Sequence, residues 1–123
     1  MAVASLTSQI TLALNVRDRH ASAKWFEEMF GFCLLFHADD VGWSEMTTLT
    51  EGVTLGLAGG DGPASGDALI IFGTADLDRA RTELEAAGVH FKGETMEVDG
   101  MVKLATFLDP DKNEIMLAQD LTV

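Results

Sequence analysis

The chain carries one pattern twice, and this internal repeat constrains its fold more than any other feature. The first copy spans Ile10–Gly31 and the second spans Leu69–Gly88. In each copy an apolar run meets an Asp, Asp18 or Asp76, and an amphipathic stretch follows until a Gly stops it. Nearly equal spacing in two copies is typical of one supersecondary unit used twice. We therefore expect two similar modules that share a cleft, where the functional site should lie.

Each copy predicts a strand, a helix and then three more strands. Alternating apolar residues over 10–16 predict the first strand. Asp18 suits the N-cap of the following helix, and Gly31 suits its left-handed end. Later strands of this module are expected over 32–37, 43–49 and 53–57. The second module repeats the order, with strands over 69–73, 89–92, 103–108 and 114–118, a helix between Asp76 and Gly88, and a loop over 94–100.

The length and the apolar content fit one domain made of interlocked modules. The chain has 123 residues, of which 47% are hydrophobic, enough to form a core without disulfides. We expect a single domain over 1–123. Its first module covers about 10–58, a glycine-rich linker covers 58–67, and its second module covers about 68–119.

Charge, cysteine content and the lack of long apolar stretches bear on the partners and the cellular location of the protein. Twenty acidic residues against eight basic ones give a net charge of −12, which argues against nucleic acid and anionic membrane surfaces. No stretch approaches the roughly 20 apolar residues of a membrane span, and the first nine residues lack the basic start of a signal peptide. Cys33 has no second cysteine to pair with and is expected to be a small core residue. Together these features predict a cytoplasmic protein.

Taken in order, several short motifs resemble the vicinal oxygen chelate superfamily. This group includes glyoxalase I, the bleomycin and fosfomycin resistance proteins and the extradiol dioxygenases. The motifs are Asn15-Val16-Arg17-Asp18, Trp25-Phe26, Gly31-Phe32 and the run Phe107–Leu117. The resemblance implies an α+β fold, two tandem β-α-β-β-β modules whose curled mixed sheets form a shared cleft. Lys112 departs from the usual Gly and is expected to adopt a positive φ in its turn.

The same resemblance implies four metal-ligand positions, and this chain fills them poorly. Matched on the motifs, the four positions are Thr11, Leu55, Leu69 and Met116. These side chains are not normal ligands for a divalent ion, which prefers carboxylate, imidazole or thiolate. The three histidines are expected elsewhere, His20 in the first helical turn and His37 and His90 at strand ends. We therefore predict no metal site and no cofactor.

The strand after the first hairpin turn is the best candidate for chemistry. Trp43, Glu45 and Thr47 share one face by strand alternation. Trp43 and Glu45 side by side are suited to stack a flat ligand and fix one of its donors. A partly desolvated Glu45 is also a candidate general acid or base. A solvent-exposed face or a dimer seam remains an open alternative for this strand.

The remaining ligand contacts are predicted from neighbouring strands and from apolar side chains. Ile70 and Phe72 should pack on the helix, which leaves Leu69 and Ile71 for the cleft. Met46 and Met96 are further candidates for the lining, with plain core as the alternative. The predicted ligand-binding residues are Thr11, Ala13, Asn15, Trp43, Glu45, Leu55, Leu57, Leu69, Ile71, Met101 and Met116.

Three functions stay open at this point. The first is a metal-free protein that binds a small, largely apolar or aromatic organic molecule, as in the bleomycin resistance branch. The second is a glyoxalase-type metalloenzyme, a lyase, isomerase or dioxygenase. The third is a metal-free enzyme that uses Glu45 as acid or base. In each case we expect a homodimer, because the apolar content of a small chain leaves surface to cover.

Overall fold

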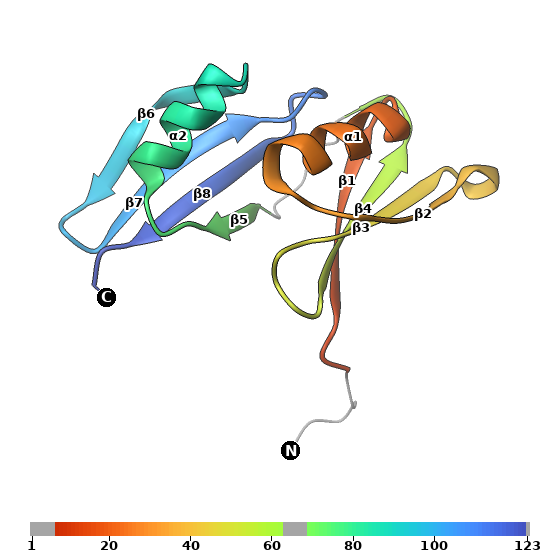
Figure 1. Ribbon diagram of the computed structural model, residues 1–123, viewed down its shortest axis with the longest axis horizontal. Coiled ribbons are helices and arrows are strands. Elements are labelled where there is room, and N and C mark those ends of the chain that lie inside the picture. The colour runs from red at the N-terminus through yellow and green to blue at the C-terminus, as the bar shows by residue number, and fades with distance from the viewer. Residues whose placement is uncertain (1–6, 63–68, 123) are drawn as a thin grey trace. The chain divides into compact units, whose positions relative to one another are not determined.

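Two similar units make up the computed structural model of the chain, in which residues 7–62 and 69–122 are described. The first unit ends at Asp61 and the second begins at Gly62. Each unit holds a four-stranded mixed sheet with one helix on one of its faces (Figure 1). The sequence repeat is therefore a structural repeat, and the predicted fold class is confirmed.

The first unit builds its sheet in the order β1-β4-β3-β2. Its first and last strands are parallel neighbours, and the other pairs are antiparallel. The elements are β1 (Ile10–Val16), α1 (Arg19–Phe30), β2 (Leu34–Ala38), a short 3-10 helix (Asp39–Val41), β3 (Trp43–Thr47) and β4 (Val53–Gly59).

The second unit repeats this topology in the order β5-β8-β7-β6. Again the first and last strands are parallel neighbours. The elements are β5 (Ile70–Gly73), α2 (Leu77–Ala86), β6 (His90–Val98), β7 (Val102–Leu108) and β8 (Glu114–Asp120).

Both helices begin at the residues that the sequence indicated. The carboxylate of Asp18 accepts a hydrogen bond from the Ala21 amide at 3.0 Å, and that of Asp76 accepts one from the Arg79 amide at 3.1 Å. These contacts satisfy backbone donors that a helix start leaves without partners. Gly31 ends α1 in the left-handed region with φ 73°. Neither of these helices is both long and apolar enough to cross a membrane.

Each unit has its own core between its helix and its sheet. In the first unit the face that packs on α1 includes Met46, Leu55 and Leu57, all with no exposed surface. Complete burial of such a side chain contributes roughly 1.5–3 kcal/mol to folding. In the second unit Leu77 of α2 and Phe107 of β7 are likewise fully buried. Each sheet therefore has one face covered by its helix.

Strand β6 is longer than the sequence predicted. Residues 94–100 were expected to form a loop, but β6 continues to Val98 and pairs with β7 on both sides of an irregularity between Lys92 and Met96. Gly93 has φ 73° at this bulge. Arg81 Nη2 donates to the Gly93 carbonyl at 2.8 Å, which gives that backbone oxygen a partner. Glycine there marks a bulge within a strand and not the end of one.

Two smaller expectations also need correction. Ala58 and Gly59 belong to β4, where they pair with Asn15 and Val16, so the start of the predicted linker is a strand. The rest of that linker falls mostly on residues 63–68, which lie outside the described part of the chain. Cys33 is exposed and is not a core residue, because its neighbour Phe32 takes the inward position at 4% exposure.

The turn between β7 and β8 is organised by a buried carboxylate. Asp109 is 4% exposed and accepts hydrogen bonds from the amides of Asp111 at 3.0 Å and Asn113 at 2.7 Å. The side-chain amide of Asn113 donates to its other oxygen at 2.9 Å. Burial is the main influence on this carboxyl, and it raises the pKa of Asp109. Lys112 has φ 69°, the positive value expected for this turn position.

Candidate ligand-binding face

The first sheet leaves one face uncovered by its helix, and most predicted site residues of this unit lie there. Strand alternation and the strand registers place these side chains in rows across the sheet. One row holds Thr11, Thr54 and Thr47; the next holds Ala13, Gly56, Glu45 and Phe36; the third holds Asn15, Ala58 and Trp43. We call this surface the first open face.

An indole and a carboxylate are fixed against each other on the first open face. Trp43 Nε1 donates a hydrogen bond to Glu45 Oε1 at 3.0 Å. The ring lies over Gly56 of the neighbouring strand, where an added Cβ would collide with its Cζ2 and Cη2 atoms. Both side chains are partly buried. Gly56 therefore makes room for Trp43, and Glu45 sets the ring's orientation, so the predicted pair exists as a defined unit.

Leu55 and Leu57 were placed on the wrong side of the sheet by the sequence interpretation. Both are completely buried on the face that packs on α1, together with Met46. Since neighbouring residues of a strand point to opposite faces, Thr54 and Gly56 take the open positions instead. The hydroxyls of Thr11 and Thr54 share a hydrogen bond of 2.8 Å there.

The second sheet has a corresponding uncovered surface, the second open face, which is more apolar. Leu69 and Ile71 are 50% and 53% exposed, as predicted for the side away from α2. Met116 is half-buried and lies next to Ile71 in the register, with Thr106 on its other side. The same registers add Gly73, Ala118, Leu104, Met96, Val102, Val98, Asp120 and Leu108, together with the polar residues His90, Lys92 and Glu114 at the other end of the face.

A shallow hollow of about 570 Å³ lies at one end of the second open face. Its wall includes the predicted contact Met101, which is 59% exposed in the turn between β6 and β7. Asp120 stands in the same wall, and hydrogen bonds from Thr122 lower the pKa of its carboxyl. The full lining is Gly73, Thr74, Met101, Val102, Ala118, Asp120 and Thr122.

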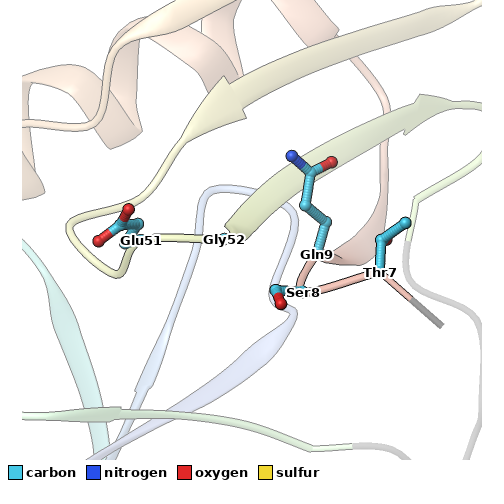
Figure 2. A pocket seen from close by; sticks show the side chains of 5 residues that line it. All are labelled: Thr7, Ser8, Gln9, Glu51 and Gly52. Carbon is cyan, nitrogen blue, oxygen red and sulfur yellow. The ribbon is translucent and has the colours of Figure 1, made fainter.

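A second hollow, of about 550 Å³, lies in the first unit between the segment before β1 and the turn before β4. Figure 2 shows its lining residues, Thr7, Ser8 and Gln9 on one side and Glu51 and Gly52 on the other. Gly52 has φ 80°, and a Cβ there would collide with the Ser8 carbonyl oxygen. The hollow does not include Trp43 or Glu45, and no sequence motif indicated it.

The family's metal positions do not fit a divalent ion in this chain. Thr11 and its neighbour Thr54 offer neutral hydroxyls, and these are already bonded to each other. On the second open face Leu69 offers no donor atom, and Met116 offers only a thioether. Hard cations require several oxygen ligands, and zinc requires imidazole, thiolate or carboxylate. These positions therefore make an apolar and hydroxylic surface.

The structure brings two histidines together that the sequence analysis kept apart. The rings of His20 in α1 and His37 in β2 are stacked, with centroids 3.7 Å apart. Asp39, just after β2, accepts hydrogen bonds from Arg19 Nη2 at 2.8 Å and from His20 Nε2 at 2.9 Å. The Arg19 and His20 contacts lower the pKa of the Asp39 carboxyl. The sequence placed His20 at a helix start and His37 at a strand end. The possibility that these two ends meet at one sheet edge was the signal that could have indicated the cluster.

Paired β-α-β-β-β units, each with one open sheet face, define a class of small proteins of the glyoxalase type. The sequence model of the Glyoxalase/Bleomycin resistance protein/Dioxygenase superfamily matches residues 8–117, and the chain belongs to this superfamily.

Solved structures with the same fold include binding proteins and resistance proteins. TnmS3, an antibiotic binding protein from Streptomyces sp. CB03234, is 25% identical with a TM-score of 0.75, over 98% of this chain and 99% of that chain. A superfamily member from Sphaerobacter thermophilus DSM 20745 is 20% identical with a TM-score of 0.80, over 94% and 98%. The fosfomycin resistance protein FosX from Listeria monocytogenes is 18% identical with a TM-score of 0.75, over 98% and 97%. No functionally curated protein matches the sequence.

Proposed function

We propose that this protein binds a small, largely apolar or aromatic organic molecule, without a divalent metal on its open sheet faces. The observation that carries the proposal is the Trp43 indole, held over Gly56 and hydrogen-bonded to Glu45 on the first open face. A fixed aromatic ring offers a flat ligand a stacking surface at little entropic cost. The carboxylate beside it offers an acceptor for a ligand donor.

Three further observations support binding over chemistry on a metal. The positions that the family resemblance implies for metal carry Thr11, Leu69 and Met116, with Thr54 on the open face in place of the expected Leu55. Apolar side chains on the second open face suit the body of an organic ligand, and Met116 and Met101 suit ligands of varied shape. TnmS3, at 25% identity, is an antibiotic binding protein.

An enzyme that uses Glu45 as acid or base is the second candidate. The observation that favours it is that Glu45 is partly buried and already hydrogen-bonded to an indole. Such an enzyme would turn over its ligand with a pH–rate profile that Glu45→Gln abolishes. A binding protein would return the ligand unchanged.

The test uses tryptophan fluorescence, because the chain has only two tryptophans. A Trp25→Phe variant leaves Trp43 as the single reporter. A panel of flat aromatic, aliphatic and sugar-like compounds is titrated against it. We expect saturable quenching by flat aromatic compounds and none by sugar-like compounds. Absence of saturable quenching by every aromatic compound, while Trp25→Phe remains folded, would contradict the proposal.

The matched control replaces Trp43 and keeps Trp25. A Trp43→Phe variant retains Trp25, which lies in α1 and makes edge contacts with Phe26 and Phe30. Ligand affinity measured by calorimetry should fall in Trp43→Phe and stay unchanged in Trp25→Phe. Elemental analysis of the ligand-bound unchanged chain and of its Thr11→Val variant tests the metal-free part, since a metal held by this face would be present in the first and lost in the second.

We also propose that the protein is a homodimer. Three consecutive apolar side chains are exposed on β2, where Leu34, Leu35 and Phe36 are 40%, 50% and 45% exposed at the edge of the first sheet. An edge strand with such side chains favours pairing with a second chain.

A further inference from the structure

His20, His37 and Asp39 form a side-chain cluster on the side of the first sheet opposite to Trp43 and Glu45. His37 pairs with Ser44 in the register, and Ser44 and Glu45 point to opposite faces. His20 stands in the first turn of α1, which covers that side. One ligand atom from each of the three residues lies within 4.8 Å of the others. The cluster is therefore separate from the proposed ligand-binding face.

The donor set is the kind that transition metals select. Two imidazoles and one carboxylate bind Zn²⁺, Fe²⁺ or Ni²⁺ with bonds of about 2.0–2.2 Å. At a tetrahedral ion such bonds place the donors about 3.3–3.5 Å apart. Metal binding thus requires the most distant donors, which lie within 4.8 Å of each other, to approach by up to about 1.4 Å. His20 and Asp39 are 57% and 64% exposed, so both side chains have room to move.

His37 is already oriented as a metal ligand usually is. Its Nδ1 shares a hydrogen bond of 2.7 Å with Ser44 Oγ, and Ser44 has no exposed surface. Ser44 is held in turn by Arg19 Nη1, which donates to it at 2.7 Å. Metal-bound histidines typically fix their second ring nitrogen in this way, which sets the ring orientation. Nε2 is then the ligand atom of His37.

The proton of the hydrogen bond between His20 and Asp39 occupies a position that a metal ion can take. His20 Nε2 donates to Asp39 Oδ1 at 2.9 Å, and a metal ion would replace this proton. The stacked rings of His20 and His37 cannot both aim in-plane lone pairs at one point, so His20 must turn out of the stack. Arg19 beside Asp39 opposes a bound cation, and the net charge of −12 favours one.

We propose that His20, His37 and Asp39 form a binding site for one divalent transition-metal ion, zinc being the reference ion, at the edge of the first sheet. The ion would link the start of α1 to the end of β2. The site lies away from the family's metal positions and is independent of the organic ligand.

The experiment titrates Zn²⁺ into the untagged full-length chain in competition with a chromogenic chelator. We expect one Zn²⁺ per chain, with affinity that decreases on acidification because protons compete for the imidazoles. His20→Gln and Asp39→Asn should each weaken binding by about tenfold or more, as should removal of the supporting hydroxyl in Ser44→Ala. His20→Gln is the decisive variant, because its exposed side chain can be changed without disturbing the core.

The matched control is His90→Gln, which removes the exposed histidine at the start of β6 in the second unit. It should bind Zn²⁺ as the unchanged chain does. No stoichiometric binding, or equal affinity in His20→Gln, would overturn the proposal. Loss of binding in His90→Gln or Thr11→Val would also overturn it, and the Thr11→Val result would place the ion on the first open face.

Discussion

Trp43 Nε1 donates to Glu45 Oε1 at 3.0 Å, so the two functional candidates of β3 hold each other two residues apart on one strand face. This contact has a direct consequence for mutagenesis, because a Gln at position 45 keeps an oxygen acceptor for the indole. The charge is lost while the contact is retained.

Glu45→Gln should therefore weaken ligand binding more than it weakens the fold. We expect the free energy of unfolding to change by about 0.5 kcal/mol or less, as for a substitution that keeps its contacts. Affinity for a ligand with a hydrogen-bond donor should fall by about tenfold, the equivalent of 1.4 kcal/mol. Calorimetric titration and urea unfolding measure the two quantities. Unchanged affinity would remove Glu45 from the site.

Gly56→Ala should displace the Trp43 ring, because the new Cβ would occupy the position of its Cζ2 and Cη2 atoms. We expect a destabilisation of about 1–3 kcal/mol from overpacking, a shifted Trp43 emission maximum and weaker ligand binding. Gly60→Ala is the control, since a Cβ at Gly60 has no neighbour within 4 Å. The same emission spectrum in both variants would show that the indole does not rest on Gly56.

The stability losses of Leu55→Ala and Ile71→Ala should distinguish a core position from a position on an open sheet face. Leu55 has no exposed surface, and truncating it should cost about 2–5 kcal/mol of unfolding free energy. Ile71 is 53% exposed, and its truncation should cost about 0.5 kcal/mol. Urea unfolding decides between them. Similar losses of stability in the two variants would contradict the assignment of their faces.

Asp109 should make stability fall as pH rises. Burial raises the pKa of its carboxyl above the ordinary value of 3.8, so the folded chain binds this proton more tightly than the unfolded chain. The resulting stabilisation is complete below pH 3.8 and is lost as pH rises through the folded-state pKa. The stability of the unchanged chain relative to Asp109→Asn should therefore decrease as pH rises above 3.8 and through the folded-state pKa.

Asp120 should change stability with pH in the opposite direction to Asp109 in the same experiment. Hydrogen bonds from Thr122 lower its pKa below 3.8, so its contribution is present above that value and is lost as pH falls through the folded-state pKa. Relative to Asp120→Asn, the unchanged chain should gain stability as pH rises. A trend of the same sign for both variants would contradict one of the two assignments, and the direction of the trend would show which.

The proposed homodimer predicts a species of twice 13.2 kDa in sedimentation equilibrium at micromolar concentration. Leu35→Glu should shift the equilibrium toward the monomer, because a charge would enter the apolar edge strand. Leu49→Glu is the control, since Leu49 is 80% exposed in the turn after β3. A monomer at all concentrations would exclude the dimer.

The fold was predictable because the repeat, the Asp18 and Asp76 caps and the strand periods all indicated the same topology. The sequence did not determine which residues of a strand face the helix, or which residues distant in the chain come into contact. A shift of one residue on β4 exchanged Leu55 for Thr54, since strand neighbours point to opposite faces. A loop was expected over residues 94–100, whereas Gly93 lies at a bulge and β6 continues to Val98. His20 and His37 are far apart in the chain, and only the meeting of α1 with the sheet edge brings them together.

The parallel pairs β1–β4 and β5–β8 have a consequence for how the chain folds while it is being synthesised on the ribosome. Every strand pairing of the first sheet joins residues between Ile10 and Gly59, so its ladder can be completed before the second helix has been synthesised. Closing β1 onto β4 is the long-range step of that unit, and until it occurs the growing chain displays unpaired strand edges. Translation rate across residues 53–59 is therefore expected to influence the yield of native protein.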